Sequence, residues 1–276
     1  MIPKVPVQIK LGKGCVYLYD FGKIKMHAFM SNDPLNDVSF MLEKDGLGLV
    51  LEPQCFSKSV REFEKYIKKC DVGILGLVVG YHYSGGKFLP NVKRYGSRSA
   101  KFVGTTHGSR TIMGWLARLF RNDFDNSTNF IDYYVDDGQK ITIGGIQVIA
   151  LKTKEGLDLV FPEIKTMYVH VFGANTHSIL YSMEHIAETI ENWKNSVGKR
   201  YSYIISSHGL LEDSRNIRKK VAYLKALRKV AHKSRSAKDF KKTMMKRYPD
   251  YDGREYLDMT SRLLFNNKSA ETTAEK

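Results

Sequence analysis

The chain has 276 residues, of which 42% are hydrophobic and 12% aromatic. This composition excludes a disordered or collagen-like chain and suffices for one large globular domain or two small ones. The longest apolar run, residues 72–80, is too short to span a membrane, and the first ten residues lack an apolar signal segment. Three scattered cysteines without a CxxC pair indicate reduced thiols, so we expect a cytoplasmic protein with no membrane span.

The formal net charge is +15, from 44 Lys and Arg against 29 Asp and Glu. Residues 215–247 alone hold 14 of the basic residues and one acidic residue, which leaves 30 basic and 28 acidic residues elsewhere. The excess charge therefore belongs to one segment. Such a local segment is a weaker indication of nucleic-acid binding than a basic face built from many elements.

Short β-branched or aromatic runs, separated by Gly, Asn and Asp, predict strands over the first two-thirds of the chain. Gly144-Gly145 between two of these runs predicts a two-residue hairpin, and the continuously apolar run 73–79 is typical of a strand buried on both faces. The predicted strands cover residues 15–19, 24–28, 38–42, 47–52, 73–79, 140–143, 146–151, 157–161, 166–172 and 201–206.

Helical spacing of apolar residues predicts the remaining elements. Ser59-Val-Arg-Glu62 has the pattern of a capping box, and the helix beyond Ser214 is amphipathic, with basic residues on its outer faces. Predicted helices begin at Ser59, Ser109, Ser182 and beyond Ser214, and two more cover residues 237–246 and 254–265. We expect a sandwich domain over residues 1–232 and a C-terminal helical extension, residues 233–276, packed on it.

Three segments place a histidine at or just after a predicted strand, where a rigid scaffold presents functional groups. The first, residues 78–86, contains His82, and the third, residues 206–209, contains His208. The second, residues 168–177, contains His170 and His177.

These segments resemble the metallo-β-lactamase superfamily and, within it, the lactamase-like domain of flavodiiron proteins, over roughly residues 36–230. The resemblance rests on the strand pair ending at Leu51-Glu52-Pro53, the unit ending in Gly85-Gly86, the Phe172-Gly-x-x-x-His177 segment and Ser207-His208-Gly209. It implies an α+β fold, an αββα sandwich of two mixed sheets flanked by helices, with a metal site at one sheet edge. Phe161-Pro162-Glu163 gives a weaker match to the alkylsulfatase branch.

The family's metal motif, His-x-His-x-Asp-His-x-Gly-Gly, is degenerate in this chain. The two positions that serve the first metal are occupied by Val78 and Gly80, and no histidine lies near residues 153–155, where the family's third motif should fall. The positions that serve the second metal align with His82, His170 and His208. Three imidazoles suit zinc or iron and leave a coordination position open for water.

The resemblance therefore implies a metal-dependent hydrolase with a mononuclear three-His site that acts on a small anionic substrate such as a phosphate, sulfate or carboxylate ester. His208 belongs to this catalytic set, with His177 or Glu52 as a supporting group or base. Lys87, Arg94 and Arg98 near the motif either attract the anion or are ordinary solvated charges.

Other interpretations stay open at this point. The histidines also fit a catalytically inactive binding or sensor member of the fold, in which they are merely hydrogen-bonded. A third alternative is an oxygen- or nitric-oxide-related flavodiiron-like protein that lacks its flavodoxin domain. Nucleic-acid binding through residues 215–247 is the fourth, although the amphipathic pattern favours a helix with a solvated basic face.

Overall fold

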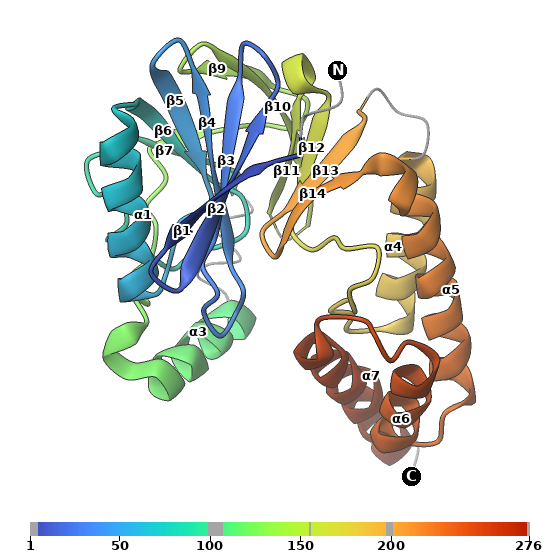
Figure 1. Ribbon diagram of the computed structural model, residues 1–276. Helices are drawn as coiled ribbons and strands as arrows, with labels where there is room; N and C mark the ends of the chain where they lie inside the picture. Colours follow the sequence, from blue (N-terminus) through green and yellow to red (C-terminus); the bar gives the residue numbers. More distant parts are fainter. Residues whose placement is uncertain (1–4, 99–106, 155, 197–200, 275–276) are drawn as a thin grey trace. The chain divides into compact units, whose positions relative to one another are not determined.

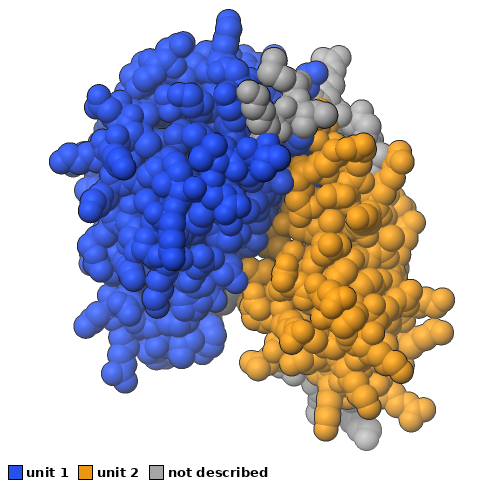
Figure 2. All heavy atoms as spheres, viewed as in Figure 1, with its two compact units in different colours: residues 1–170, 203–211 blue, residues 171–202, 212–276 orange. Residues whose placement is uncertain are grey.

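The computed structural model describes residues 5–98, 107–154, 156–196 and 201–274 (Figure 1). The chain forms two compact units, one of residues 1–170 and 203–211, the other of residues 171–202 and 212–276 (Figure 2). The domain boundary expected between residues 232 and 233 lies inside the second unit and stays a prediction. No helix in the described ranges is long and apolar enough to cross a membrane.

The first unit contains an eight-stranded sheet whose strands follow one another in chain order. Neighbours from β1 to β5 pair antiparallel, and those from β5 to β8 pair parallel, so the sheet is mixed. The strands are β1 (Val7–Leu11), β2 (Gly14–Asp20), β3 (Lys25–Met30), β4 (Val38–Lys44), β5 (Leu47–Leu51), β6 (Gly73–Val79), β7 (Arg94–Gly96) and β8 (Tyr133–Tyr134).

A second, six-stranded sheet has the order β14-β13-β12-β11-β10-β9. Strands β9 to β12 pair antiparallel, whereas β12 and β13 run parallel. Gly144 and Gly145 form the β9–β10 turn with φ angles of 58° and 73°, which confirms the predicted hairpin. The strands are β9 (Lys140–Ile143), β10 (Ile146–Lys152), β11 (Leu157–Phe161), β12 (Thr166–Val169), β13 (Tyr203–Ser206) and β14 (Gly209–Asp213).

The main core lies between the two sheets. Phe40, Leu51 and Val78 of the first sheet and Leu159 and Phe161 of the second belong to one cluster of buried apolar side chains. The arrangement of two mixed sheets flanked by helices confirms the predicted α+β sandwich. It also explains why these strands appear as continuous apolar runs in the sequence.

Helix α1 (Ser57–Cys70) covers the other face of the first sheet, where its Phe63 stacks on Phe29 with ring centroids 4.7 Å apart. The predicted capping box at Ser59 is wrong. The helix begins at Ser57, and Ser59 is a buried residue of its first turn. Helix α3 (His107–Phe120) contributes Leu116 to a small apolar cluster that also contains Phe56.

The second unit is helical. Its elements are α4 (Met183–Ser196), α5 (Ile217–Lys233), α6 (Ala237–Arg247) and α7 (Arg254–Ala274). In α5 the predicted apolar stripe, including Ile217, Leu224 and Leu227, is buried, as the amphipathic pattern requires.

One basic residue of α5 lies on the buried side of that helix. The Lys220 ammonium donates hydrogen bonds to the carbonyl oxygens of Gly173 and Thr176, at 3.2 and 2.7 Å. Burial lowers the pKa of Lys220 from 10.5 to about 7, against an opposing contribution from the Glu212 carboxylate. The second unit therefore holds a lysine whose protonation is sensitive to mildly alkaline pH.

We predict that the second unit becomes more stable as the pH rises from 7 to 9. The unfolded chain keeps the Lys220 proton up to a pKa near 10.5, whereas the folded chain loses it near 7. Because the unfolded state binds more protons in this window, the free energy of unfolding rises, by roughly 2 kcal/mol. Urea denaturation of wild type and Lys220→Met at both pH values measures the effect. The variant should lose the rise, and an equal rise in Lys220→Met and wild type would contradict the assignment. The exposed control Lys219→Met should keep it.

Candidate metal centre

Three histidines of the first unit follow the C-terminal ends of three strands. His82 lies three residues after β6, His170 directly after β12 and His208 two residues after β13. Strands β12 and β13 are parallel and in register at Val169 and Ser206, so they end at the same sheet edge. Strand β12 stops at Val169, three residues earlier than the sequence predicts, and this releases His170 from the sheet.

The three imidazoles converge. One nitrogen from each of His82, His170 and His208 lies within 4.8 Å of the other two. The Nε2 atoms of His82 and His208 are 3.4 Å apart. Metal–nitrogen bonds of about 2.0–2.1 Å in a tetrahedral site place ligand nitrogens at about this separation. The spacing therefore fits a transition-metal ion.

All three rings are neutral at pH 7, because burial disfavours the imidazolium. Desolvation lowers the pKa of His82 to about 4 and that of His208, with a contribution from neighbouring His82, to about 3. The pKa of His170 is lowered well below its ordinary value by burial and by the other two rings. Neutral imidazole is the form that binds metals, so proton competition at neutral pH is small.

A backbone contact sets the tautomer of His208. Its Nδ1 lies 3.2 Å from the carbonyl oxygen of Leu35, which only accepts hydrogen bonds. Nδ1 therefore carries the proton and Nε2, which faces His82, keeps its lone pair. Metal-ligating histidines in proteins commonly have this arrangement, with the second nitrogen bonded to a carbonyl group.

Tyr81 fixes the ring of His170. The two rings are stacked with centroids 4.5 Å apart and an interplanar angle of 6°. The Tyr81 hydroxyl donates to Asp158 Oδ1 at 2.6 Å and lies 3.1 Å from Thr153 Oγ1. The hydrogen-bonded ring of Tyr81 thus fixes the orientation of the His170 ring.

Glu52 connects all three ligand-bearing segments. Its buried carboxylate accepts the backbone N–H groups of Tyr81, at 2.8 Å, and His82, at 3.1 Å. It also accepts the hydroxyl of Tyr168, which in turn lies 2.6 Å from Ser207 Oγ. Tyr168 is two residues before His170, and Ser207 is adjacent to His208. One hydrogen-bonded chain therefore fixes the backbone around all three histidines.

Local backbone geometry allows this contact. Glu52 has a φ of 63°, so the chain leaves β5 directly after Leu51. A Cβ atom at Gly80 would lie 2.5 Å from Glu52 Oε1, so only glycine permits this approach. Burial raises the pKa of Glu52 to about 7, although its hydrogen bonds from Tyr168 and the loop N–H groups oppose the rise. The structure places Glu52 as an anchor of the His82 loop, and its predicted role as a base stays a prediction.

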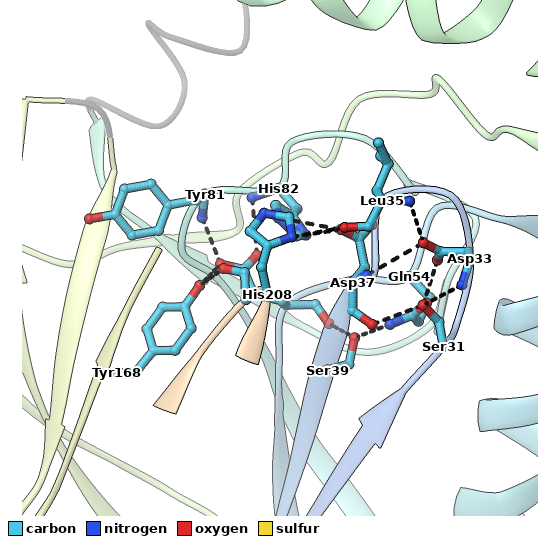
Figure 3. Close-up of polar contacts among 12 residues, drawn as sticks. Ser31, Asp33, Leu35, Asp37, Ser39, Gln54, Tyr81, His82, Tyr168 and His208 are labelled. Carbon is cyan, nitrogen blue, oxygen red and sulfur yellow. Dashed lines mark hydrogen bonds and ion pairs between the residues drawn. The ribbon is translucent and has the colours of Figure 1, made fainter. Parts of the chain in front are cut away.

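Asp37 adds a carboxylate beside the rings (Figure 3). Its side chain is 3% exposed, and Oδ1 lies 3.4 Å from His208 Nδ1 and 4.0 Å from His82 Nε2. This oxygen and His82 Nδ1 are buried without a hydrogen-bond partner in the described part of the chain. Burial, with Asp33 and Glu52 nearby, raises the pKa of Asp37 well above its ordinary value. A cation among the imidazoles would favour the ionised form of Asp37 and compensate its charge, so the unpartnered Oδ1 fits a metal site.

His177 belongs to the second unit. Its buried ring lies with Nδ1 2.9 Å from the Tyr223 hydroxyl, and its backbone N–H donates to the carbonyl oxygen of Asp252. Its predicted role as a base or supporting group stays a prediction.

Arg94 does not have the solvent-facing position that attraction of an anion requires. Its guanidinium is buried and donates to Asn129 Oδ1 and to the carbonyl oxygens of Gly86, Phe88 and Val92. These bonds hold the loop after His82 onto β7. The guanidinium of Arg94 therefore stabilises this loop through its hydrogen bonds.

Sequence reasoning missed Asp37, Tyr168 and the stacking of Tyr81 on His170. Asp37 follows Asn36 in a segment that looks like ordinary loop punctuation, and no spacing relates it to the histidines. Tyr168 lies within a strand and has the pattern of a core residue. The one available signal was Ser207, because it adjoins His208 in the Ser207-His208-Gly209 pattern.

No protein-family model and no curated protein matches the chain. Solved structures do match it. A metallo-β-lactamase family protein from Thermus thermophilus has a TM-score of 0.62 at 9% identity, over 90% of this chain and 94% of that one. A β-lactamase domain protein from Burkholderia ambifaria has a TM-score of 0.63 at 12% identity, over 93% and 88% of the two chains.

The stereoselective inverting sec-alkylsulfatase of Pseudomonas sp. also matches, with a TM-score of 0.62 at 11% identity over 91% of this chain. The match covers 50% of the sulfatase, so the chain spans about half the length of that enzyme. Together these similarities show that the chain has the metallo-β-lactamase fold.

We predict that Glu52→Gln lowers the free energy of unfolding by about 2 kcal/mol. The glutamine amide keeps the shape of the side chain but replaces one acceptor oxygen with an NH2 donor. The groups around it, the N–H groups of Tyr81 and His82 and the hydroxyl of Tyr168, are themselves donors. Chemical denaturation of the metal-free protein measures the loss. Glu62→Gln, on an i,i+4 ion pair with Lys58, is the control and should change stability by less than about 0.5 kcal/mol. Equal effects would contradict the anchoring role.

We predict that Asp37→Asn weakens metal binding about 10- to 100-fold, the cost typical of losing a carboxylate beside a metal ligand. The metal-free variant should be at least as stable as wild type, because the substitution removes an unpartnered buried carboxylate. Competition with a chromophoric zinc chelator and thermal unfolding measure the two effects. Asp45→Asn, in the exposed β4–β5 turn, should leave both unchanged. An affinity of Asp37→Asn within twofold of wild type would count against the assigned contact.

Proposed function

We propose that the protein is a metal-dependent hydrolase with a mononuclear site formed by His82, His170 and His208. The observation that carries the proposal is the convergence of three neutral, largely buried imidazoles that follow the ends of β6, β12 and β13. Within the described ranges this is the one group of three or more His, Cys, Asp or Glu side chains with metal-binding geometry. The chemistry that bound zinc or ferrous iron would supply is Lewis-acid activation of water for hydrolysis.

The chain's own residues have separate tasks in this proposal. The three imidazoles supply a neutral ligand set, and Asp37 balances part of the charge of the cation. Tyr81 holds the ring of His170, while Glu52 holds the backbone that presents His82. Because Tyr81 and Glu52 are themselves hydrogen-bonded, the ligands are positioned before a metal arrives, which lowers the cost of binding it.

The proposed substrate is a small anionic ester. Similarity to a sec-alkylsulfatase and to metallo-β-lactamase family proteins supports hydrolysis of an ester or amide bond as the reaction class. Phosphate, sulfate and carboxylate esters all suit a site that combines a cation with low exposure to water. The geometry of the three-His site, in contrast, does not support a closer relation of this chain to the flavodiiron branch.

We predict that protein purified without a His-tag binds about one zinc or iron per chain and hydrolyses at least one member of a panel of sulfate, phosphate and carboxylate esters. Chelation should abolish turnover. His170→Ala and His208→Ala should each lower kcat/KM by at least about 100-fold and remove the metal, because two imidazoles cannot complete the site.

The matched control is His232→Ala, since His232 is exposed on α5 in the second unit. It should keep both the metal and the activity. Elemental analysis and initial rates on the same preparations separate the outcomes. Absence of stoichiometric metal, or full metal content in His170→Ala, would contradict the proposed site. Metal without turnover of any ester would contradict the hydrolase assignment.

A further inference from the structure

A groove of about 420 Å³ runs between α4 and α5 of the second unit. These two helices pack against each other (Figure 1). Helix α5 contributes Lys225, Arg228, Lys229 and Lys233 to the lining, and α4 contributes Glu191 and Lys194. The groove is therefore lined largely by cationic side chains.

Five basic residues of α5 form one stripe along the groove. Residues 225, 229 and 233 are spaced four apart, as are residues 228 and 232, and side chains at this spacing share one face of a helix. Over these positions the stripe extends about 12 Å along the helix axis. Five basic residues of α5 therefore gather beside the groove, whereas Lys220 lies on the buried side of the helix.

The cations of the stripe are not neutralised within the described part of the chain. Lys194 pairs with Glu191 at 2.5 Å, on the α4 side. No ion pair involves Lys225, Arg228, Lys229 or Lys233 among the residues that the structure describes. Like charges three or four residues apart destabilise a helix by a few tenths of a kcal/mol per pair, so a bound polyanion would relieve a repulsion built into α5.

The lining distinguishes between kinds of polyanion. A membrane surface is normally held by apolar side chains inserted beside the basic ones, yet the large exposed apolar residues found in the second unit, Tyr181, Met259 and Leu263, do not line the groove. Single-stranded nucleic acid is normally held by several large aromatic side chains that stack on successive bases, and the groove has no Phe, Tyr or Trp in its lining and a single imidazole, that of His232. Contacts to the phosphates of a duplex need neither feature.

We propose that the α4–α5 groove binds the phosphate backbone of double-stranded nucleic acid without regard to base sequence. Lys225, Arg228, Lys229 and Lys233 each contact a phosphate group. This function is independent of the three-His centre, because every residue that carries it belongs to the second unit.

Fluorescence anisotropy with a labelled 20-base-pair DNA duplex of mixed sequence tests the proposal. EDTA in the buffer removes any contribution from metal-dependent cleavage. With four phosphate contacts, the logarithm of the association constant should fall with the logarithm of salt concentration with a slope of about −3.5. A duplex of unrelated sequence should bind with the same affinity and slope.

The double variant Lys225→Gln/Lys229→Gln should bind at least about tenfold more weakly near 0.1 M salt and should lower the magnitude of the slope by about 2. The control Lys238→Gln/Lys242→Gln removes the same charge from exposed positions of α6, outside the groove, and should change affinity by less than about twofold. All four positions are exposed, so both variants should fold normally, which circular dichroism verifies.

Three outcomes would overturn the proposal. The first is absence of duplex binding by wild type at about 50 mM salt. The second is an equal loss of affinity in both double variants, which would show a diffuse charge effect instead of a groove. The third is binding to vesicles containing phosphatidylserine together with no binding to the duplex, which would identify a lipid surface as the partner.

Discussion

The buried carboxylate of Glu52 is the constraint on which the candidate centre depends. It accepts backbone N–H groups from the loop that carries His82 and the hydroxyl of Tyr168, and through Tyr168 it reaches Ser207. The three ligand segments come from two different sheets and from strands far apart in the sequence. The parallel ends of β12 and β13 bring two of them to one sheet edge, but strand ends alone leave loops free to vary. The hydrogen bonds of Glu52 to the His82 loop and to Tyr168, together with that of Tyr168 to Ser207, convert this proximity into fixed positions.

Water exclusion gives the cluster its chemical character. Burial keeps the imidazoles of His82, His170 and His208 neutral, and among the described residues Oδ1 of Asp37 beside them has no hydrogen-bond donor. Neutral nitrogens next to an uncompensated carboxylate attract a cation more strongly in a dry environment than in water. The same burial costs free energy when no cation is present. The centre thus combines fixed geometry with an electrostatic preference for a divalent ion.

The sequence predicted the local elements well because their signals are local. The Gly144-Gly145 hairpin and the buried stripe of α5 depend on residues close in the chain, and both were confirmed. The end of β12 was predicted three residues too late, since Val171 and Phe172 look like strand residues although the chain leaves the sheet after Val169. The contacts of Asp37, Tyr81 and Glu52 join residues tens of positions apart, and no pattern in one sequence records such pairings. The sequence likewise located the basic segment at residues 215–247. The groove beside it depends on the packing of α4 on α5, which the sequence does not record.

X-ray absorption at the metal edge of the loaded protein tests the central claim most directly, because it counts the ligands around the ion. The account predicts three imidazole nitrogens at about 2.0–2.1 Å, with the multiple scattering typical of histidine rings, and two in His170→Ala reloaded with excess metal. A shell of oxygen ligands alone, or a spectrum identical in wild type and His170→Ala, would contradict it.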